Sequence, residues 1–410
     1  MLLTGARLAD GRTVDVRLRG AWIDAIEGVG RLHAAADEQT VDLAGHVLLP
    51  ALVEPHAHLD KAFLAERLLN PTGDLMGAIT VMQNSRHLIT VEDTIERAER
   101  AVRLMVSNGA TLIRTHADAT QENGLTSIEA LVEVKRRVQD VCEMQIAVLV
   151  SWPLTGTEGA KNRSLLRDAL AVGGDVVGGC PHLDDDPAGA NDALIDIAAE
   201  TGRDIDVHTD ETLDPSRLTL EHLARRVLET GFAHRVTASH CVSLGVQTET
   251  RQREVADLVA EAGISVVALP QTNLFLQGRS NQTAMPRALT AVKALREAGV
   301  NVCAGADNLQ DPFNPMGRGD PLETAALMVM AAHLRPDEAL HCVSGAARRA
   351  LTGGVWGVQV GDGAELVAIA ADTTREALAY ARQDRTVIHN GRLVSGAHSH
   401  AAAGHETKSS

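Results

Sequence analysis

The stretch Leu52-Val53-Glu54-Pro55-His56-Ala57-His58-Leu59-Asp60-Lys61 decides the fold that we expect for this chain. Its His-x-His pair closes the apolar run Val-Leu-Leu-Pro-Ala-Leu-Val at residues 47–53. Side chains two residues apart in a β-strand point to the same face, so His56 and His58 at a strand end can reach one metal ion together. Two imidazoles do not complete a metal site, and the remaining ligands must therefore lie on other strands.

Downstream of this stretch the sequence repeats one pattern, namely a short apolar run, a loop, an amphipathic stretch and a glycine. In the first copy, the apolar residues between Ile95 and Met105 share one face of a predicted helix. Thr90 is the predicted N-cap of this helix, and the helix ends at Gly109. The pattern predicts eight strands, at residues 52–55, 111–115, 145–150, 175–177, 204–207, 235–238, 264–268 and 300–304. Eight strands alternating with helices over about 300 residues predict an α/β fold, a (β/α)8 TIM barrel.

The two ends of the chain differ from this repeat. Residues 1–50 consist of short apolar runs broken by Gly and Asp, which is typical of a small β-meander, and residues 357–396 return to the same texture. We predict that these two parts form one small β-sandwich beside a metal-dependent barrel at residues 51–356. Residues 397–410 are small and polar, with three histidines that we expect to be solvated, and we predict that they form a disordered tail.

Composition and charge exclude several classes of function. The chain has 410 residues, 45% of them hydrophobic and 22% charged, which is typical of a globular protein. We find no membrane-spanning run and no secretory signal, so we expect a cytoplasmic protein. The formal net charge of −16 argues against nucleic acid and membrane partners and favours a small-molecule substrate. Five scattered cysteines argue against disulfides and against a thiolate zinc site. We also expect the protein to be a homo-oligomer.

The active site of a TIM barrel lies at the carboxyl ends of its strands, and polar residues gather at the predicted ends. These residues are His56, His58, His116, Asp118, Trp152, His182, His208, Glu211, His240, Asn273 and Asp307. Packing alone does not explain His, Glu and Asp at the same end of strands 1, 5, 6 and 8. A metal ion held by three neutral imidazoles and one carboxylate lowers the pKa of a bound water. We interpret His116 and His182 as supporting residues, and Lys61 as a surface or substrate-contacting residue.

The motifs at these positions resemble the amidohydrolase superfamily and, within it, the cytosine deaminase branch. They are Val-Glu-Pro-His-Ala-His-Leu-Asp at 53–60, Arg-Thr-His-Ala-Asp at 114–118, Asp-Val-His-Thr-Asp-Glu at 206–211, Val-Thr-Ala-Ser-His at 236–240, Asn-Leu-Phe-Leu-Gln-Gly-Arg at 273–279 and Asp-Asn at 307–308. The resemblance implies one divalent metal ion, Fe(II) or Zn(II), with the ligands His56, His58, His208 and Asp307. It also implies that hydroxide on the metal attacks the substrate while Glu211, His240 and Asp307 handle protons.

The resemblance also marks positions that contact the substrate. Cytosine deaminases end strand 3 with an aromatic residue, a proline and a base-reading Gln, whereas this chain has Trp152-Pro153-Leu154. Asn308 replaces the Asp of the bacterial cytosine deaminases, as in the triazine-ring aminohydrolases of the same branch. The predicted substrate-binding residues are Trp152, Leu154, Asn273, Asn308 and Phe313. Because Leu154 offers no hydrogen bond, we expect cytosine to be a poor substrate.

The leading hypothesis is a hydrolytic deaminase that replaces an exocyclic amine on an N-heterocycle with oxygen, and thus a hydrolase of carbon–nitrogen bonds other than peptide bonds. One alternative is a related hydrolase that opens a cyclic amide or imide. Release of ammonia or an alkylamine, as opposed to a new carboxylate, distinguishes these two reactions. A further alternative is a catalytically inactive barrel used for binding, against which the complete set of His, Glu and Asp residues argues.

Overall fold

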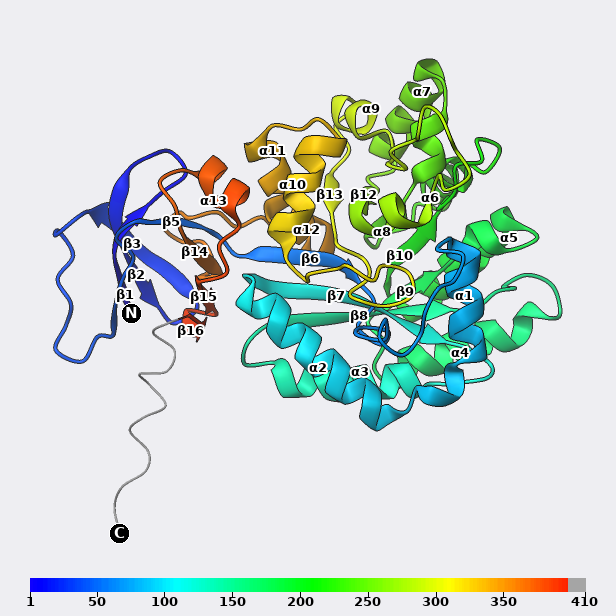
Figure 1. Cartoon of the computed structure of the whole chain (residues 1–410), viewed down its shortest axis with the longest axis horizontal. Helices are drawn as coiled ribbons and strands as arrows, with labels where there is room; N and C mark the ends of the chain where they lie inside the picture. The colour runs from blue at the N-terminus through cyan, green and yellow to red at the C-terminus, as the bar shows by residue number, and fades with distance from the viewer. Residues whose placement is uncertain (397–410) are drawn as a thin grey trace, which may run out of the picture.

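Eight parallel strands form one of two sheets in the computed structural model, which describes residues 1–396 (Figure 1). In sheet order they are β6 (Leu52–Ala57), β7 (Ala110–Ala119), β8 (Glu143–Val150), β9 (Val176–Gly179), β10 (Asp204–Thr209), β11 (Val236–His240), β12 (Ser265–Ala268) and β13 (Val302–Ala304). The chain after β13 closes this sheet against β6, because Asp307 N–H donates to His56 O at 3.0 Å and Asp307 O accepts from His58 N–H at 3.2 Å. The predicted barrel and all eight of its strands are confirmed.

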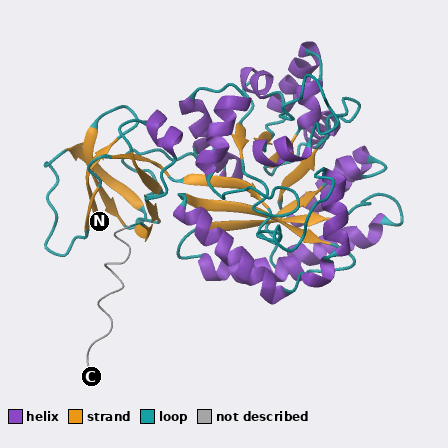
Figure 2. Cartoon of the chain, in the orientation of Figure 1, coloured by secondary structure: helices purple, strands orange, loops and turns teal. Residues whose placement is uncertain are grey.

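Helices surround the barrel strands, as Figure 2 shows in purple around orange. They include α2 (Val91–Ser107), α3 (Thr126–Val138), α4 (Gly159–Val172), α5 (Pro187–Thr201), α6 (Thr219–Thr230), α7 (Glu249–Glu261), α9 (Val292–Glu297), α10 (Pro321–Ala331), α11 (Pro336–Cys342) and α12 (Gly345–Thr352).

The ends of these helices follow the expected capping chemistry. Helix α2 begins after Thr90, whose hydroxyl accepts from the N–H of Asp93 at 3.2 Å, and its Ala98, Val102 and Met105 are buried in the core. Helix α5 ends at Gly202, which adopts a left-handed conformation with φ of 64° that costs glycine little.

The second sheet contains strands from both ends of the chain. They are β1 (Leu2–Arg7), β2 (Thr13–Arg19), β3 (Trp22–Gly28), β4 (Thr40–Asp42), β5 (His46–Pro50), β14 (Leu366–Ala370), β15 (Arg385–His389) and β16 (Arg392–Ser395). Strand β14 joins the two ends, because it pairs antiparallel with β5, with Ala368 opposite Leu48. These two residues are fully buried together with Leu3, Val16 and Ile388, so this sheet has a core of its own. Helix α13 (Thr374–Tyr380) connects β14 to β15.

The two chain ends therefore form a separate mixed sheet beside the barrel, which Figure 1 shows on the left. We retain residues 1–50, 51–356 and 357–396 as proposed domain limits. The disorder predicted for residues 397–410 concerns a segment outside the described residues. Within residues 1–396, no helix combines the length and apolar character that crossing a membrane would require.

A long connection between β6 and α2 carries further helical segments. They are α1 (Leu75–Asn84) and the 3-10 turn η1 (Arg86–Leu88). The Asp74 side chain caps α1 by accepting from the N–H of Gly77 at 2.7 Å. This connection supplies one wall of the cavity described next.

Candidate active site

A cavity with an empty volume of about 730 Å³ lies at the carboxyl ends of the barrel strands. One wall comes from these strand ends and the loops that follow them, and includes His58, Asp118, Trp152, His208, Glu211, His240, Asp307 and Asn308. The facing wall comes from the connection after β6 and includes Lys61, Leu75, Ile79, Met82, Gln83 and Arg86. The cavity therefore combines polar groups from the strand ends with the apolar side chains of Leu75, Ile79 and Met82 from α1.

Imidazole and carboxylate groups meet at the bottom of the cavity. His58 Nε2 lies 3.1 Å from both His208 Nε2 and Asp307 Oδ1, and His56 Nε2 lies 3.5 Å from the same carboxylate oxygen. Ligand atoms placed 2.0–2.1 Å from a tetrahedral zinc ion lie about 3.3 Å from one another. These three separations are therefore close to the spacing of ligand atoms around one metal ion.

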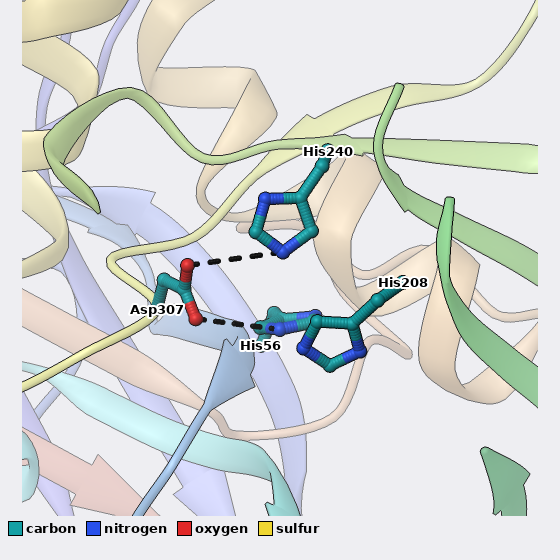
Figure 3. Close-up of side chains that lie close together, drawn as sticks. All are labelled: His56, His208, His240 and Asp307. Atoms are coloured by element: carbon teal, nitrogen blue, oxygen red, sulfur yellow. Dashed lines mark ion pairs between the residues drawn. The ribbon is translucent and has the colours of Figure 1, made fainter. Parts of the chain in front are cut away.

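Several atoms of this cluster lack hydrogen bonds within residues 1–396. They include the buried atoms His56 Nε2 and Asp307 Oδ1, together with the buried Nε2 of the neighbouring His240. A buried polar atom without a partner costs about 1–3 kcal/mol, and a bound cation would remove that cost. The ligand atoms of His56, His208, His240 and Asp307 all lie within 4.8 Å of one another, and Figure 3 shows these side chains converging.

The charge states of the cluster also suit a cation. Burial lowers the pKa of His58 and of His208, so both imidazoles are neutral and keep a lone pair for a metal. Burial on its own would raise the pKa of Asp307, but the neighbouring His56 and His58 hold it well below its ordinary value. Neutral imidazoles with one carboxylate could therefore hold a divalent ion.

His240 ends β11 and approaches Asp307 from the other side. Its Nδ1–H donates to Asn273 Oδ1 at 3.1 Å, so the lone pair of Nε2 faces Asp307 Oδ2 at 3.9 Å (Figure 3). Burial lowers the pKa of His240 to about 3. His240 and Asp307 have φ values of 70° and 68°, which are uncommon for residues with side chains and occur most often at functional sites.

Glu211 follows β10 and lies beside His240, with 3.7 Å between Glu211 Oε1 and His240 Nδ1. The residue is 6% exposed and lines the cavity. Burial and the nearby carboxylate of Asp307 raise the pKa of Glu211 well above its ordinary value. The raised pKa favours the protonated form of Glu211, which can then donate a proton at the cavity wall.

The two supporting histidines lie behind the cluster. His182 Nδ1–H donates to the carbonyl oxygen of His208 at 3.0 Å, and thus holds the end of β10. The His116 ring stacks on that of His56 with 3.9 Å between centroids. Both residues are buried, and neither lines the cavity.

The predicted substrate-binding residues divide into two groups. Trp152, Asn308 and Phe313 line the cavity, as expected, whereas Leu154 and Asn273 do not. Leu154 is 2% exposed and belongs to the barrel core, and Asn273 is fully buried against His240. The apolar surface that we expected from Leu154 comes instead from α1.

Lys61 is a buried cavity residue, and its alternative interpretation as a surface residue is wrong. Only 4% of Lys61 is exposed, and its Nζ donates to Asp118 Oδ1 at 2.7 Å and to Asp60 Oδ1 at 3.2 Å. Burial alone would lower the pKa of this ammonium, but Asp118 and Asp60 raise it above its ordinary value. Lys61 is charged, and its acidic partners neutralise it.

The wall formed by α1 was not predicted from the sequence. A signal was present, because Leu75, Ile79 and Met82 have the spacing of one helical face. The pattern does not show that this face lines a cavity. Arg86, which follows α1, donates to Glu122 at 2.5 Å and thereby links this wall to the loop after β7.

This chain is similar to known proteins over most of its length. The Amidohydrolase family profile matches residues 78–395. A pterin deaminase of Rhizobium rhizogenes (strain K84) is 34% identical over 88% of this chain and 83% of its own.

Two solved structures, one of a deaminase and one of an aminohydrolase, are also similar to the structure of this chain. The 5-methylcytosine deaminase of Klebsiella pneumoniae, liganded with 5-fluorocytosine, is 32% identical with a TM-score of 0.87, covering 97% of each chain. The N-isopropylammelide isopropylaminohydrolase of Burkholderia multivorans is 29% identical with a TM-score of 0.83, covering 96% of this chain and 97% of its own.

The chain belongs to the amidohydrolase family. This family assignment and these relatives confirm the prediction of a deaminase-type hydrolase that acts on carbon–nitrogen bonds other than peptide bonds.

Proposed function

We propose that this protein is a metal-dependent deaminase that replaces an exocyclic amine on a small N-heterocycle with oxygen and releases ammonia or an alkylamine. The observation that carries the proposal is the meeting of three imidazoles and one carboxylate beside Glu211, a carboxyl group whose pKa is raised. The family and the deaminase relatives support the same reaction class.

In this proposal His56, His58, His208 and Asp307 hold one Fe(II) or Zn(II) ion. The spacing of their ligand atoms and the buried atoms without hydrogen bonds support this set. When bound, the ion lowers the pKa of a water molecule and so supplies a nucleophile near neutral pH. The end of β9, Gly178-Gly179-Cys180, carries no lysine that could bridge two ions, which favours a single ion.

The proposed proton path uses the two groups that face the metal cluster. Hydrolytic deamination moves both protons of a water molecule, so that the ring nitrogen and the departing amine each gain one proton. The carboxyl group of Glu211, whose raised pKa favours its protonated form, donates its proton to the ring nitrogen. Asp307 or the Nε2 lone pair of His240 accepts one proton from the water and passes it to the amine, and the other water proton returns to the Glu211 carboxylate.

The rest of the cavity suits a flat heterocycle. The ring of Trp152 and the apolar side chains of Leu75 and Ile79 line it. Asn308 offers polar atoms close to Asp307, but its Nδ2 already donates to Asp311 Oδ2 at 2.8 Å. We propose aminated pyrimidines and pterins as the first substrates to examine, since deaminases of both kinds are similar to this chain.

The test is amine release from a panel of aminated pyrimidines, pterins, purines and triazines, with the purified protein supplied with Fe(II) or Zn(II). We expect release of ammonia or an alkylamine without a new carboxylate. A new carboxylate from a cyclic amide or imide would instead identify a ring-opening enzyme. We also retain, as predictions, a cytoplasmic location and assembly into a homo-oligomer.

A further inference from the structure

A chain of hydrogen bonds runs from His56 into the barrel interior, away from the cavity. His56 Nδ1 lies 2.9 Å from Ser239 Oγ, and Ser239 Oγ donates to Asp206 Oδ1 at 2.9 Å. All three residues are fully buried. Arg114, which is 1% exposed, donates from Nη1 to Asp206 Oδ2 at 2.9 Å and completes the chain.

The direction of these bonds determines which nitrogen of His56 carries the proton. A hydroxyl group has one hydrogen, and Ser239 gives it to the Asp206 carboxylate, which can only accept. The Ser239 oxygen must therefore accept from His56 Nδ1–H. The other nitrogen, Nε2, is then unprotonated, and it is the nitrogen that faces Asp307 Oδ1 at 3.5 Å.

Arg114, at the end of the hydrogen-bond chain farthest from His56, is itself held in place. Arg114 is held by Gln145 Oε1, which accepts from Nη2 at 2.8 Å and from Nε at 3.1 Å. These groups come from two pairs of neighbouring strands, β7 with β8 and β10 with β11, which hold the direction of the hydrogen bonds. A buried carboxylate is stable only when paired, and the guanidinium of Arg114 supplies the pairing charge for Asp206.

A second reading of the same residues is a second metal site. Ligand atoms of His56, His116 and Asp206 lie within 4.8 Å of one another, and both nitrogens of His116 lack partners in the described part of the chain. However, both Asp206 oxygens already accept hydrogen bonds, and His56 Nδ1 is used by Ser239. The Arg114 guanidinium, whose Nη1 lies 2.9 Å from Asp206 Oδ2, would repel a cation bound to that carboxylate. The contacts therefore favour the hydrogen-bonded chain.

We propose that Ser239, Asp206 and Arg114 are positioning residues that hold His56 in the tautomer with a free Nε2 and thereby set the metal affinity of the site. This inference rests on the metal centre of the proposed function. It predicts that the affinity for metal depends on groups that do not touch the ion, the substrate or the cavity. Removing hydrogen-bond partners of metal-bound histidines typically costs about 10- to 100-fold in metal affinity.

The main variant is Ser239→Ala, which leaves His56 Nδ1–H without an acceptor. We expect its zinc affinity, measured by chelator competition on the full chain without substrate, to fall about 10- to 100-fold. Ser243→Ala is the matched control, because Ser243 is also fully buried but its hydroxyl has no hydrogen-bond partner within residues 1–396. The control should bind zinc like the wild type.

A second variant, Asp206→Asn, tests the direction of the chain. Arg114 needs an acceptor, so the amide oxygen takes the place of Oδ2 and the amide nitrogen faces Ser239. Ser239 then accepts from this nitrogen and turns its own hydrogen toward His56 Nδ1, which forces the His56 proton onto Nε2. We expect zinc affinity to fall at least as far as in Ser239→Ala, and ¹⁵N spectra of labelled histidine to lose the signal of the Nδ1–H tautomer of His56.

Three results would overturn the inference. In the first, both variants bind zinc with an affinity within about threefold of the wild type. In the second, the wild-type protein binds two zinc ions and the Asp206→Asn variant binds only one. In the third, the wild-type protein binds no zinc. A loss of thermal stability in the metal-free variants with unchanged zinc affinity would show a purely structural role and would also overturn it. If the expected order of affinities is found but no heterocycle is deaminated, only the proposed function fails.

Discussion

The two facing walls of the cavity differ in how they are built and in what they present. The strand wall carries His58, His208 and Asp307 on strand ends or just beyond them, and each is less than 7% exposed. The helical wall comes from one short helix, α1, whose cavity-lining residues are mainly apolar and lie in a long connection. Barrel strands hold polar groups in a fixed geometry, whereas a helix in a connection can change without disturbing the barrel.

This difference suggests a division of labour. The strand wall should determine whether a metal binds and whether the reaction proceeds. The helical wall should determine which heterocycle fits. Substitutions on the two walls should therefore affect different kinetic constants, and the following predictions test that separation in order of decreasing effect.

The largest effect is expected for His208→Ala on the strand wall. Loss of this imidazole removes one of the proposed ligands, so metal and deaminase activity should disappear together. Metal content by elemental analysis and amine release are the measurements. His222→Ala is the control. His222 lies on α6 and does not line the cavity, and its Nε2 lies 2.9 Å from Asp192 Oδ1. Full metal content in His208→Ala would exclude His208 as a ligand.

The next largest effect is expected for Glu211→Gln. The amide keeps the shape of the side chain but cannot transfer the proton, so kcat should fall about 10²- to 10⁴-fold while metal content and thermal stability stay the same. Glu261→Gln, on the exposed end of α7, provides the control for the chemical change. A kcat within a few-fold of the wild type would assign the proton transfer to another group.

A smaller effect, on KM and not on kcat, is expected for a substitution in the helical wall. Ile79→Ala removes apolar contact surface from the cavity, so KM should rise about tenfold while kcat and metal content change little. Met76→Ala is the control, because Met76 is on the same helix but 57% exposed and does not line the cavity. A fall in kcat equal to the rise in KM would show that α1 also positions the reacting atoms, and the two walls would not be separable.

The smallest effect on specificity is expected for Leu154→Gln. Because Leu154 lies in the barrel core, a Gln amide there would be buried away from the substrate and would destabilise the fold by roughly 1–3 kcal/mol if it finds no partner. The ratio of kcat/KM values for cytosine and 5-methylcytosine should stay within about threefold of the wild-type ratio. Thermal melting and these two ratios are the measurements, and a shift toward cytosine would restore Leu154 as a substrate-reading residue.

The sequence by itself determined the barrel and the chemical groups of the strand wall. The alternation of apolar runs, amphipathic stretches and glycines predicted β6 to β13, because strand and helix have different residue periods. The His-x-His pair of β6 and the polar residues after β10, β11 and β13 were found because the carboxyl ends of parallel barrel strands meet at one face.

Only the tertiary structure decided which residues form the opposite wall and which hold the ligands in place. The position of α1 depends on how a long connection folds back over the barrel, and the pattern of Leu75, Ile79 and Met82 shows an apolar face but not what it covers. Leu154 follows Trp152 by two residues, yet Trp152 lines the cavity and Leu154 enters the core. Such assignments depend on contacts between residues far apart in the chain. The bond from Ser239 to His56, across 183 residues, is one of these contacts, and no local period in the sequence can reveal it.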